Sequence, residues 1–163
     1  MEAEITSILP GPIIRAAAVD EAEAVRVIVD AAYRPYIPRI GKPPGPMLDD
    51  YAARIANDQV WVILADAGIV GVIVLEETGD AFLLDNIAIA PDQQGKGYGR
   101  LLLEFAEAQA VDRGWGEVKL YTNALMTENI SLYRRIGYVE TARVTERGFD
   151  RVYMMKRLGG NSG

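Results

Sequence analysis

The feature that most constrains this chain is a glycine-rich loop between an apolar segment and a helix-forming segment. Residues 93–100 read QQGKGYGR and follow the apolar run at 87–90. Glycines at alternating positions let successive backbone N–H groups point into one concavity, and the following helix adds its positive N-terminal end. Lys96 and Arg100 bring two cations to the same edge. The loop therefore predicts an anion site suited to a pyrophosphate.

Other interpretations of this loop fit less well. A simple turn without a ligand needs neither three glycines nor two flanking cations. A Walker loop requires Ser or Thr directly after Gly-Lys, and here Lys96 is followed by Gly97. A dinucleotide-binding Rossmann loop has a different glycine spacing and an acid about 20 residues later. Lys119 lies near that place, with Glu117 as the nearest acid.

Hydrophobic periodicity divides the rest of the chain into strands and helices. The predicted strands are 13–18, 60–65, 69–75, 81–90, 117–123, 138–144 and 151–158, with a hairpin turn at 66–68. The predicted helices are 20–33 with Asp20 as its cap, 48–57, 101–114 and 128–138. Residues 36–47 are so rich in proline and glycine that a long loop without regular structure is expected. This order predicts an α/β (α+β) fold in which helices pack on the faces of a mixed sheet.

Composition bounds the organisation and the chemistry. The 163 residues predict one domain over 1–163, with loosely ordered ends at 1–10 and 159–163. Without Cys or His, thiolate nucleophiles, zinc knuckles and imidazole bases are excluded, so an acid or base must be a carboxylate, Tyr or Lys. A formal charge of -6 disfavours nucleic acid as a partner. No apolar run is long enough for a membrane span and no signal peptide is apparent, so a cytoplasmic location is expected.

Two motifs together resemble the GNAT superfamily of N-acetyltransferases. The first is Gln94-x-x-Gly97-x-Gly99 after a strand, which is similar to the acetyl-CoA signature of that superfamily. The second is Asn129-Ile-Ser-Leu-Tyr133, which runs on to Gly137-Tyr138. The resemblance extends over the element order from about Ile13 to Leu158 and implies a mostly antiparallel sheet of about six or seven strands with about four helices.

The resemblance also implies how acetyl-CoA binds. Amides of the loop would hold the pyrophosphate, and the pantetheine arm would pair with the preceding strand, while the strand ending at Asn123 splays away. The implied donor-binding residues are Ile87, Ala88, Ile89, Gln94, Gly95, Lys96, Gly97, Gly99, Arg100 and Asn129. No metal is implied, and a homodimer is a possible assembly.

Asn129 and Tyr133 are four residues apart and would share a helix face. The residues alone favour a structural interpretation, in which Asn129 caps the helix and Tyr133 packs in the core. The resemblance instead implies that Asn129 lies near the pantetheine and that Tyr133 is the general acid. A phenol can donate its proton to the departing thiolate of coenzyme A.

Asp85 is the candidate general base. It interrupts the apolar run LLDNIAIA, and strand alternation predicts that it shares a face with Ile87 and Ile89. A buried carboxylate there is costly unless it is hydrogen-bonded or used in catalysis. The alternative is that Asp85 is solvated, lies at a sheet edge or is paired with an arginine. Glu76 and Glu77 are rivals, and a relay of ordered water would need no dedicated base.

Substrate contacts are expected from the segment after the first helix. Tyr33, Tyr36 and Arg39 lie there, and Asn123 at a strand end is a further candidate. Arg39 would suit a substrate carboxylate. The leading hypothesis is direct acetyl transfer from acetyl-CoA to a primary amine of a small or amino-acid-like molecule. Alternatives are N-terminal acetylation of proteins or peptides, and a non-catalytic acyl-CoA-binding regulatory module.

Overall fold

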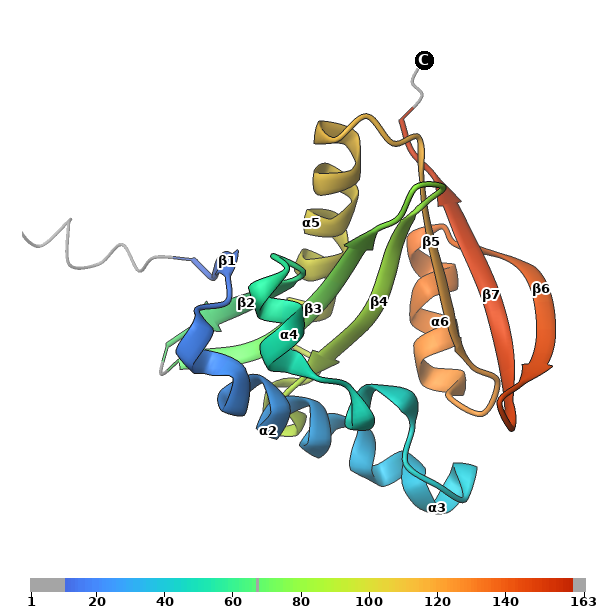
Figure 1. Ribbon diagram of the computed structural model, residues 1–163, viewed down its shortest axis with the longest axis horizontal. Coiled ribbons are helices and arrows are strands. Elements are labelled where there is room, and N and C mark those ends of the chain that lie inside the picture. The colour runs from blue at the N-terminus through green and yellow to red at the C-terminus, as the bar shows by residue number, and fades with distance from the viewer. Residues whose placement is uncertain (1–10, 67, 160–163) are drawn as a thin grey trace, which may run out of the picture.

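A seven-stranded sheet organises the molecule. The computed structural model describes residues 11–66 and 68–159, so the predicted loose ends lie outside these residues, apart from an exposed Gly159. The strand order is β1-β2-β3-β4-β5-β7-β6, and every neighbouring pair is antiparallel except β4 with β5 (Figure 1). The strands are β1 (Ile13–Ala16), β2 (Val60–Ala65), β3 (Gly68–Glu77), β4 (Phe82–Ile89), β5 (Glu117–Asn123), β6 (Val139–Glu146) and β7 (Phe149–Arg157). The predicted mixed, mostly antiparallel sheet is confirmed.

Helices cover both faces of this sheet. The α-helices are α2 (Ala22–Tyr33), α3 (Ile37–Ile40), α4 (Tyr51–Ala56), α5 (Tyr98–Asp112) and α6 (Thr127–Ile136). Short 3₁₀ turns are η1 (Val19–Glu21), η2 (Arg34–Tyr36), η3 (Gly45–Leu48) and η4 (Pro91–Gln93). Figure 1 shows α2 and α4 in front of the sheet and α5 and α6 behind it. None of the helices in the described ranges is long and apolar enough to cross a membrane.

Two hydrophobic clusters fill the space between helices and sheet. The apolar stripes of α2 and α4 pack on one face, with Val25, Val29 and Ile55 among their buried residues. On the other face α5 presents residues such as Leu102 and Leu103, and α6 presents Ile130 and Tyr133. Because β2 and β3 lie between the two clusters, almost every residue of their central parts is buried. The helical and strand periodicities of the sequence therefore reflect two packed layers on one sheet.

The segment at 36–47 is more regular than its composition predicts. Pro35 and Pro38 lie in the first turns of η2 and α3, where the missing proline N–H leaves no helical hydrogen bond unmade. Gly41 ends α3 in the left-handed conformation, with φ of 93°. The prediction of an irregular loop is therefore wrong: successive single turns connect α2 to α4.

Asp20 does not cap the first helix as predicted. It lies inside η1, which continues directly into α2, and Glu21 occupies the cap position. The Glu21 carboxylate accepts a hydrogen bond from the Ala18 N–H at 2.7 Å and pairs with Arg15 at 2.8 Å. A 3₁₀ turn ahead of the helix thus moves the helix start past the residue that the sequence pattern favoured.

Gly71 of β3 lies directly between Ile63 of β2 and Ile89 of β4. A Cβ atom built there would lie 2.7 Å from Ile89 Cδ1 and 2.9 Å from Ile63 Cγ2. Gly71→Ala should lower the free energy of unfolding by about 1–3 kcal/mol, the usual cost of overpacking a core. Urea unfolding measures this loss. Gly116→Ala is the matched control, because nothing lies within 4 Å of its Cβ position. Equal stability of the two variants would contradict the predicted crowding.

Candidate active site

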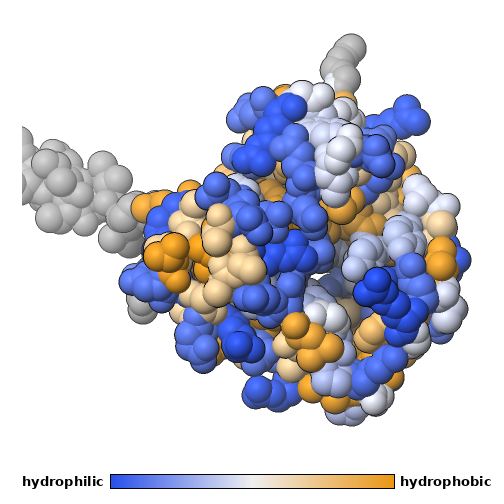
Figure 2. All heavy atoms as spheres, in the orientation of Figure 1, coloured by the Kyte–Doolittle hydropathy of each residue, from blue (hydrophilic) through white to orange (hydrophobic). Residues whose placement is uncertain are grey.

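The central strands β4 and β5 diverge and open a wedge in the sheet. They pair only at Leu83 with Lys119 and at Leu84 with Leu120, and the rest of each strand continues without a partner across the gap. Figure 1 shows the two strands separating, and Figure 2 shows a hollow in this face with hydrophilic residues along much of its rim. The divergence expected for the strand ending at Asn123 is therefore present.

A groove of about 680 Å³ lies beside the glycine-rich loop and is named here the loop groove. Its walls come from the end of β4, the loop, the start of α5 and one side of α6, and from the segment that runs from the end of α2 through η2 to α3. Of the predicted donor-binding residues it includes Ile87, Ala88, Ile89, Gln94, Gly95, Gly97, Gly99, Arg100 and Asn129. Lys96 is not among the lining residues, and its Nζ donates to Gln93 Oε1 at 3.2 Å.

The loop leaves backbone donors at the start of α5. Gly95 and Gly97 have φ of 83° and 90°, which are left-handed conformations that favour glycine. Leu101 donates the first intrahelical bond, to the Gly97 carbonyl at 3.2 Å, so the N–H groups of Tyr98, Gly99 and Arg100 precede the helical ladder. These donors, with the positive helix end, suit an anionic group in the groove.

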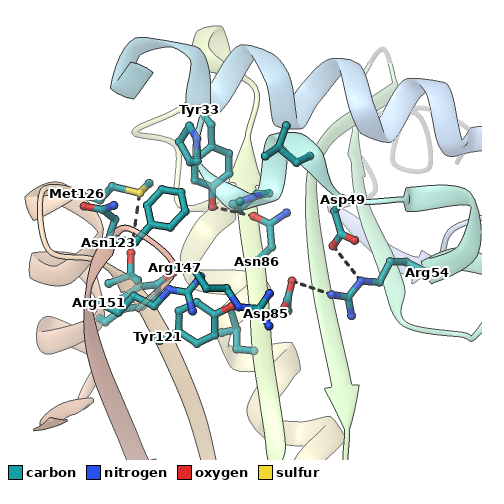
Figure 3. Close-up of a pocket in the computed structure, with 18 residues that line it drawn as sticks. Tyr33, Asp49, Arg54, Asp85, Asn86, Tyr121, Asn123, Met126, Arg147 and Arg151 are labelled. Atoms are coloured by element: carbon teal, nitrogen blue, oxygen red, sulfur yellow. Dashed lines mark hydrogen bonds and ion pairs between the residues drawn. The ribbon is translucent and has the colours of Figure 1, made fainter. Parts of the chain in front are cut away.

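A second cavity, of about 310 Å³, is named here the inner cavity (Figure 3). It lies between the diverged strands, the η3 turn and the β6–β7 hairpin, and Tyr33 is a wall of both this cavity and the loop groove. Tyr133, Asp85 and Asn123 also line it. The structure therefore brings together four of the predicted catalytic and substrate residues in one cavity.

Tyr133 projects from α6 into the wall of the inner cavity. Its side chain is only 4% exposed, and its ring packs against Tyr138 with centroids 5.8 Å apart. Burial raises the pKa of Tyr133, so the phenol keeps its proton across the physiological range. Among the described residues no hydrogen-bond partner is found for this hydroxyl. It is a neutral donor available to a molecule in the cavity.

Asn129 is not a helix cap. It is the third residue of α6, and Met126 holds the cap position. Asn129 lines the loop groove, and Tyr133, one helical turn later, lines the inner cavity. The helix α6 therefore lines both cavities.

Asp85 lies at an irregularity in β4. The β3–β4 register moves from Val74 opposite Asn86 to Leu75 opposite Leu84, so Asp85 has no residue opposite it. As a result Asp85 lines the inner cavity with Asn86, whereas Ile87 packs in the cluster on the α5 side. The prediction that Asp85 shares a face with Ile87 and Ile89 is wrong, because a bulge interrupts the strand alternation.

Asp85 is paired with Arg54 of α4. Arg54 Nη2 lies 3.3 Å from Asp85 Oδ2, and the same guanidinium contacts Asp49 at 2.9 Å and Glu76 at 3.1 Å. Burial raises the pKa of Asp85, and Arg54 only partly offsets that effect. The carboxylate is therefore a better proton acceptor than an ordinary aspartate, in a position beside the cavity (Figure 3). Glu77 instead accepts from Trp115 Nε1 at 2.6 Å, and neither Glu76 nor Glu77 lines the cavity.

A buried polar network fixes the wall that the two cavities share. Tyr33 Oη lies 2.7 Å from Asn86 Oδ1 and 2.9 Å from the Ile87 carbonyl oxygen. Its single hydroxyl hydrogen can be donated to either of these two acceptors. Asn86 Nδ2 donates to Tyr51 Oη at 2.8 Å, and Tyr51 donates to the Pro46 carbonyl at 2.6 Å. Asn86 is only 3% exposed. Sequence reasoning missed this residue, although a second polar residue beside Asp85 in an apolar run was the available signal.

Tyr36 and Arg39 line the loop groove and not the inner cavity. Arg39 binds Glu128 of α6 with both terminal nitrogens, at 2.8 and 3.2 Å, and donates to the Leu125 carbonyl at 3.0 Å. The hydrogen bonds from Arg39 lower the pKa of Glu128 to about 2. Arg39 therefore links α3 to the start of α6, and its guanidinium is already occupied by protein acceptors.

Comparison with known proteins agrees with this geometry. The protein-family model described as an acetyltransferase (GNAT) domain matches residues 56–140, which is more than half of the chain. The PaiA N-acetyltransferase from Thermoplasma acidophilum, solved with coenzyme A, superposes with a TM-score of 0.74 at 19% identity and covers 91% of this chain and 100% of its own. The ribosomal-protein-S18-alanine N-acetyltransferase from Escherichia coli gives 0.72 at 21% identity, over 93% and 97% of the two chains.

Two curated relatives match a shorter segment. The mycothiol acetyltransferase of Cellulomonas flavigena is 40% identical over 67 residues, which is 41% of this chain and 18% of the relative. That of Catenulispora acidiphila is 35% identical over 69 residues, 42% of this chain and 20% of the relative. The match thus spans about a fifth of the length of these relatives. The family model covers more than half of the chain, and the wedge between β4 and β5 and the glycine-rich loop before α5 agree with that match. The chain therefore belongs to the GNAT acetyltransferase family.

Proposed function

We propose that this protein transfers the acetyl group of acetyl-CoA to a primary amine of a small or amino-acid-like molecule, by direct transfer in a ternary complex. The observation that supports this most is the pair of cavities. One is bordered by unpaired loop amides, and the other contains a protonated tyrosine and a carboxylate. Tyr33 forms part of both walls, so a donor in the loop groove and an acceptor in the inner cavity would meet at the wedge.

On the donor side, the chain's own residues suit the parts of coenzyme A. The amides of Tyr98, Gly99 and Arg100 would bind the pyrophosphate, and the β4 backbone at Ile87 and Ile89 would align the pantetheine arm. The Ile87 carbonyl already accepts from Tyr33, which orients this part of the strand. Acetyl-CoA is a substrate in this proposal, and no metal takes part.

On the acceptor side, Asp85 would take a proton from the substrate ammonium. The free amine then attacks the thioester carbonyl, a C–N bond forms and the C–S bond breaks. Tyr133 would donate its proton to the departing sulfur, and the second proton lost by the nitrogen would restore the Tyr133 hydroxyl. Asp85 would then release its proton to water. Both groups line the same cavity, and their raised pKa values keep Tyr133 protonated and make Asp85 more basic.

One assay distinguishes the proposed function from N-terminal acetylation of peptides and from a non-catalytic regulatory module. Thiol release from acetyl-CoA is followed with small amines, amino acids and N-terminal peptides as acceptors. Thiol release with small amines supports the proposal, whereas release only with peptides favours N-terminal acetylation. Binding of coenzyme A without release on any amine favours a regulatory module. The inner cavity of about 310 Å³, lined by the η3 turn on one side and by the β6–β7 hairpin on the other, supports a small acceptor.

Gly97 tests the donor site. It has φ of 90° and nothing within 4 Å of its Cβ position, so Gly97→Ala strains the backbone without crowding a neighbour. We expect affinity for coenzyme A to fall about tenfold by calorimetry, since about 1–2 kcal/mol opposes the left-handed conformation that aims the amides. Gly41→Ala is the matched control, with φ of 93°, open space and a place outside both cavities. Unchanged affinity in Gly97→Ala, or equal losses in both variants, would contradict this role of the loop.

A further inference from the structure

The charged groups around the inner cavity are separated into an acidic end and a basic end. At the acidic end, three carboxylates surround the single guanidinium of Arg54, at 2.9 to 3.3 Å. Three carboxylates face one guanidinium, so negative charge is in excess at this end. Figure 3 shows Asp49, Arg54 and Asp85 at this end, which is formed by β4 and the α4 side of the cavity.

The basic end is formed by the β6–β7 hairpin and contains Arg147 and Arg151 (Figure 3). The Arg151 side chain is 17% exposed, and its guanidinium carbon lies 4.4 Å from the Tyr121 ring centroid and 5.6 Å from that of Phe149. Both rings lie at cation–π distance from the guanidinium, and such contacts leave its N–H groups able to bind polar partners.

Arg151 has only one weak acidic partner among the described residues. Its Nη1 lies 3.5 Å from Glu146 Oε1, and that carboxylate also accepts the hydroxyl of Tyr153. A guanidinium has five N–H donors, so most of its capacity is unused. Arg147 is exposed at the turn of the hairpin, and no ion pair of it is found in the part of the chain that the structure describes. Two cations thus face one carboxylate at this end.

We infer that the acceptor carries a carboxylate together with its amine, and that Arg151 binds that carboxylate, with Arg147 adding positive charge. This rests on the proposed function and names the substrate class of the same cavity. An ammonium group placed toward Asp85 and a carboxylate placed toward Arg151 would each meet an opposite charge. A planar guanidinium that contacts two rings suits a carboxylate, which it can bind through two parallel hydrogen bonds.

This assignment replaces the one that the sequence suggested. Arg39 was expected to hold a substrate carboxylate, but it lines the other groove and is bound by Glu128 and the Leu125 carbonyl. Arg151 gives no signal in the sequence, because it is an ordinary polar residue at the start of a predicted strand. Its partners Tyr121 and Phe149 come from different strands.

The test compares each amino acid with its carboxamide. Glycine, β-alanine, 4-aminobutanoate and larger α-amino acids are assayed by thiol release beside the matching amides, in which a neutral group of similar size replaces the carboxylate; the accompanying change in amine basicity is the same for every protein variant. We expect wild-type protein to prefer at least one carboxylate over its amide, by about 30-fold in kcat/KM. Arg151→Met should reduce that ratio to near one, and Arg151→Lys should leave it intermediate. Because the ratio is taken within one variant, a loss of folded protein does not change it.

Arg143→Met is the matched control. It removes one guanidinium from the same hairpin, but Arg143 is exposed, pairs with Glu140 at 2.6 Å and does not line the cavity. Its preference ratio should equal that of wild type. Equal rates for acids and amides in wild type, or a preference that persists in Arg151→Met, would overturn the inference. Thiol release without any carboxylate preference leaves the proposed function standing, whereas no release with any amine removes both. Dipeptides in the same panel show whether the carboxylate that Arg151 binds belongs to a free amino acid or to a short peptide.

Discussion

Replacing Tyr133 by phenylalanine should lower kcat by about 100- to 1,000-fold and leave affinity for coenzyme A within about twofold, the range expected for loss of a general acid. The variant retains the ring, which packs 5.8 Å from Tyr138 between centroids, so folding should be unaffected. No hydrogen-bond partner of the missing hydroxyl is found in the described residues, and Tyr133 lines the inner cavity. Steady-state thiol release and calorimetry with coenzyme A measure the two quantities separately.

Tyr138→Phe is the control for this experiment. The Tyr138 hydroxyl is also buried and without a hydrogen-bond partner in the structure, but its ring lines neither cavity. Removing an unpaired buried hydroxyl is expected to be neutral or slightly stabilising. Tyr138→Phe should therefore turn over at the wild-type rate. Wild-type kcat in Tyr133→Phe would exclude Tyr133 as the acid, and equal losses in both variants would indicate a packing effect.

The elements that were predicted correctly are those whose signal is local. The hairpin of β2 and β3, the helix α5 and its end at Gly114, and the glycine-rich loop all follow from periodicity or from single residues with special backbone conformations. The segment at 36–47 was predicted wrongly because prolines in first helical turns are compatible with helix, which composition alone does not reveal.

The parts of the site that could not be predicted depend on contacts between distant segments. Asn86 joins Tyr33 and Tyr51, which are 53 and 35 residues away in the chain. Arg54 and Arg151 reach the same cavity from a helix and from a strand far apart in sequence. The bulge at Asp85 follows from the β3–β4 register, so alternation within β4 alone gave the wrong face.

Replacing Asp85 by asparagine should lower kcat/KM by about 100-fold at neutral pH, as expected for loss of a general base. Asparagine has nearly the same shape but cannot accept the proton of the substrate ammonium. Burial disfavours the charged form of Asp85 and raises its pKa, so in the folded protein the carboxyl binds a proton more tightly than in the unfolded chain. Stability due to this group therefore falls as pH rises through the raised pKa, and the asparagine variant should fold at neutral pH.

The pH profile and a neighbouring carboxylate decide whether Asp85 is the base. Wild-type kcat/KM should fall as pH drops through the raised pKa of Asp85, at a higher pH than for an ordinary aspartate, and this acidic limb should be absent from the residual activity of Asp85→Asn. Glu76→Gln removes another partner of Arg54 but lies outside the cavity, so it should retain most activity and the acidic limb. If Asp85→Asn keeps wild-type activity and its limb, the ion pair with Arg54 is structural. A loss in Glu76→Gln alone would instead assign the base to Glu76.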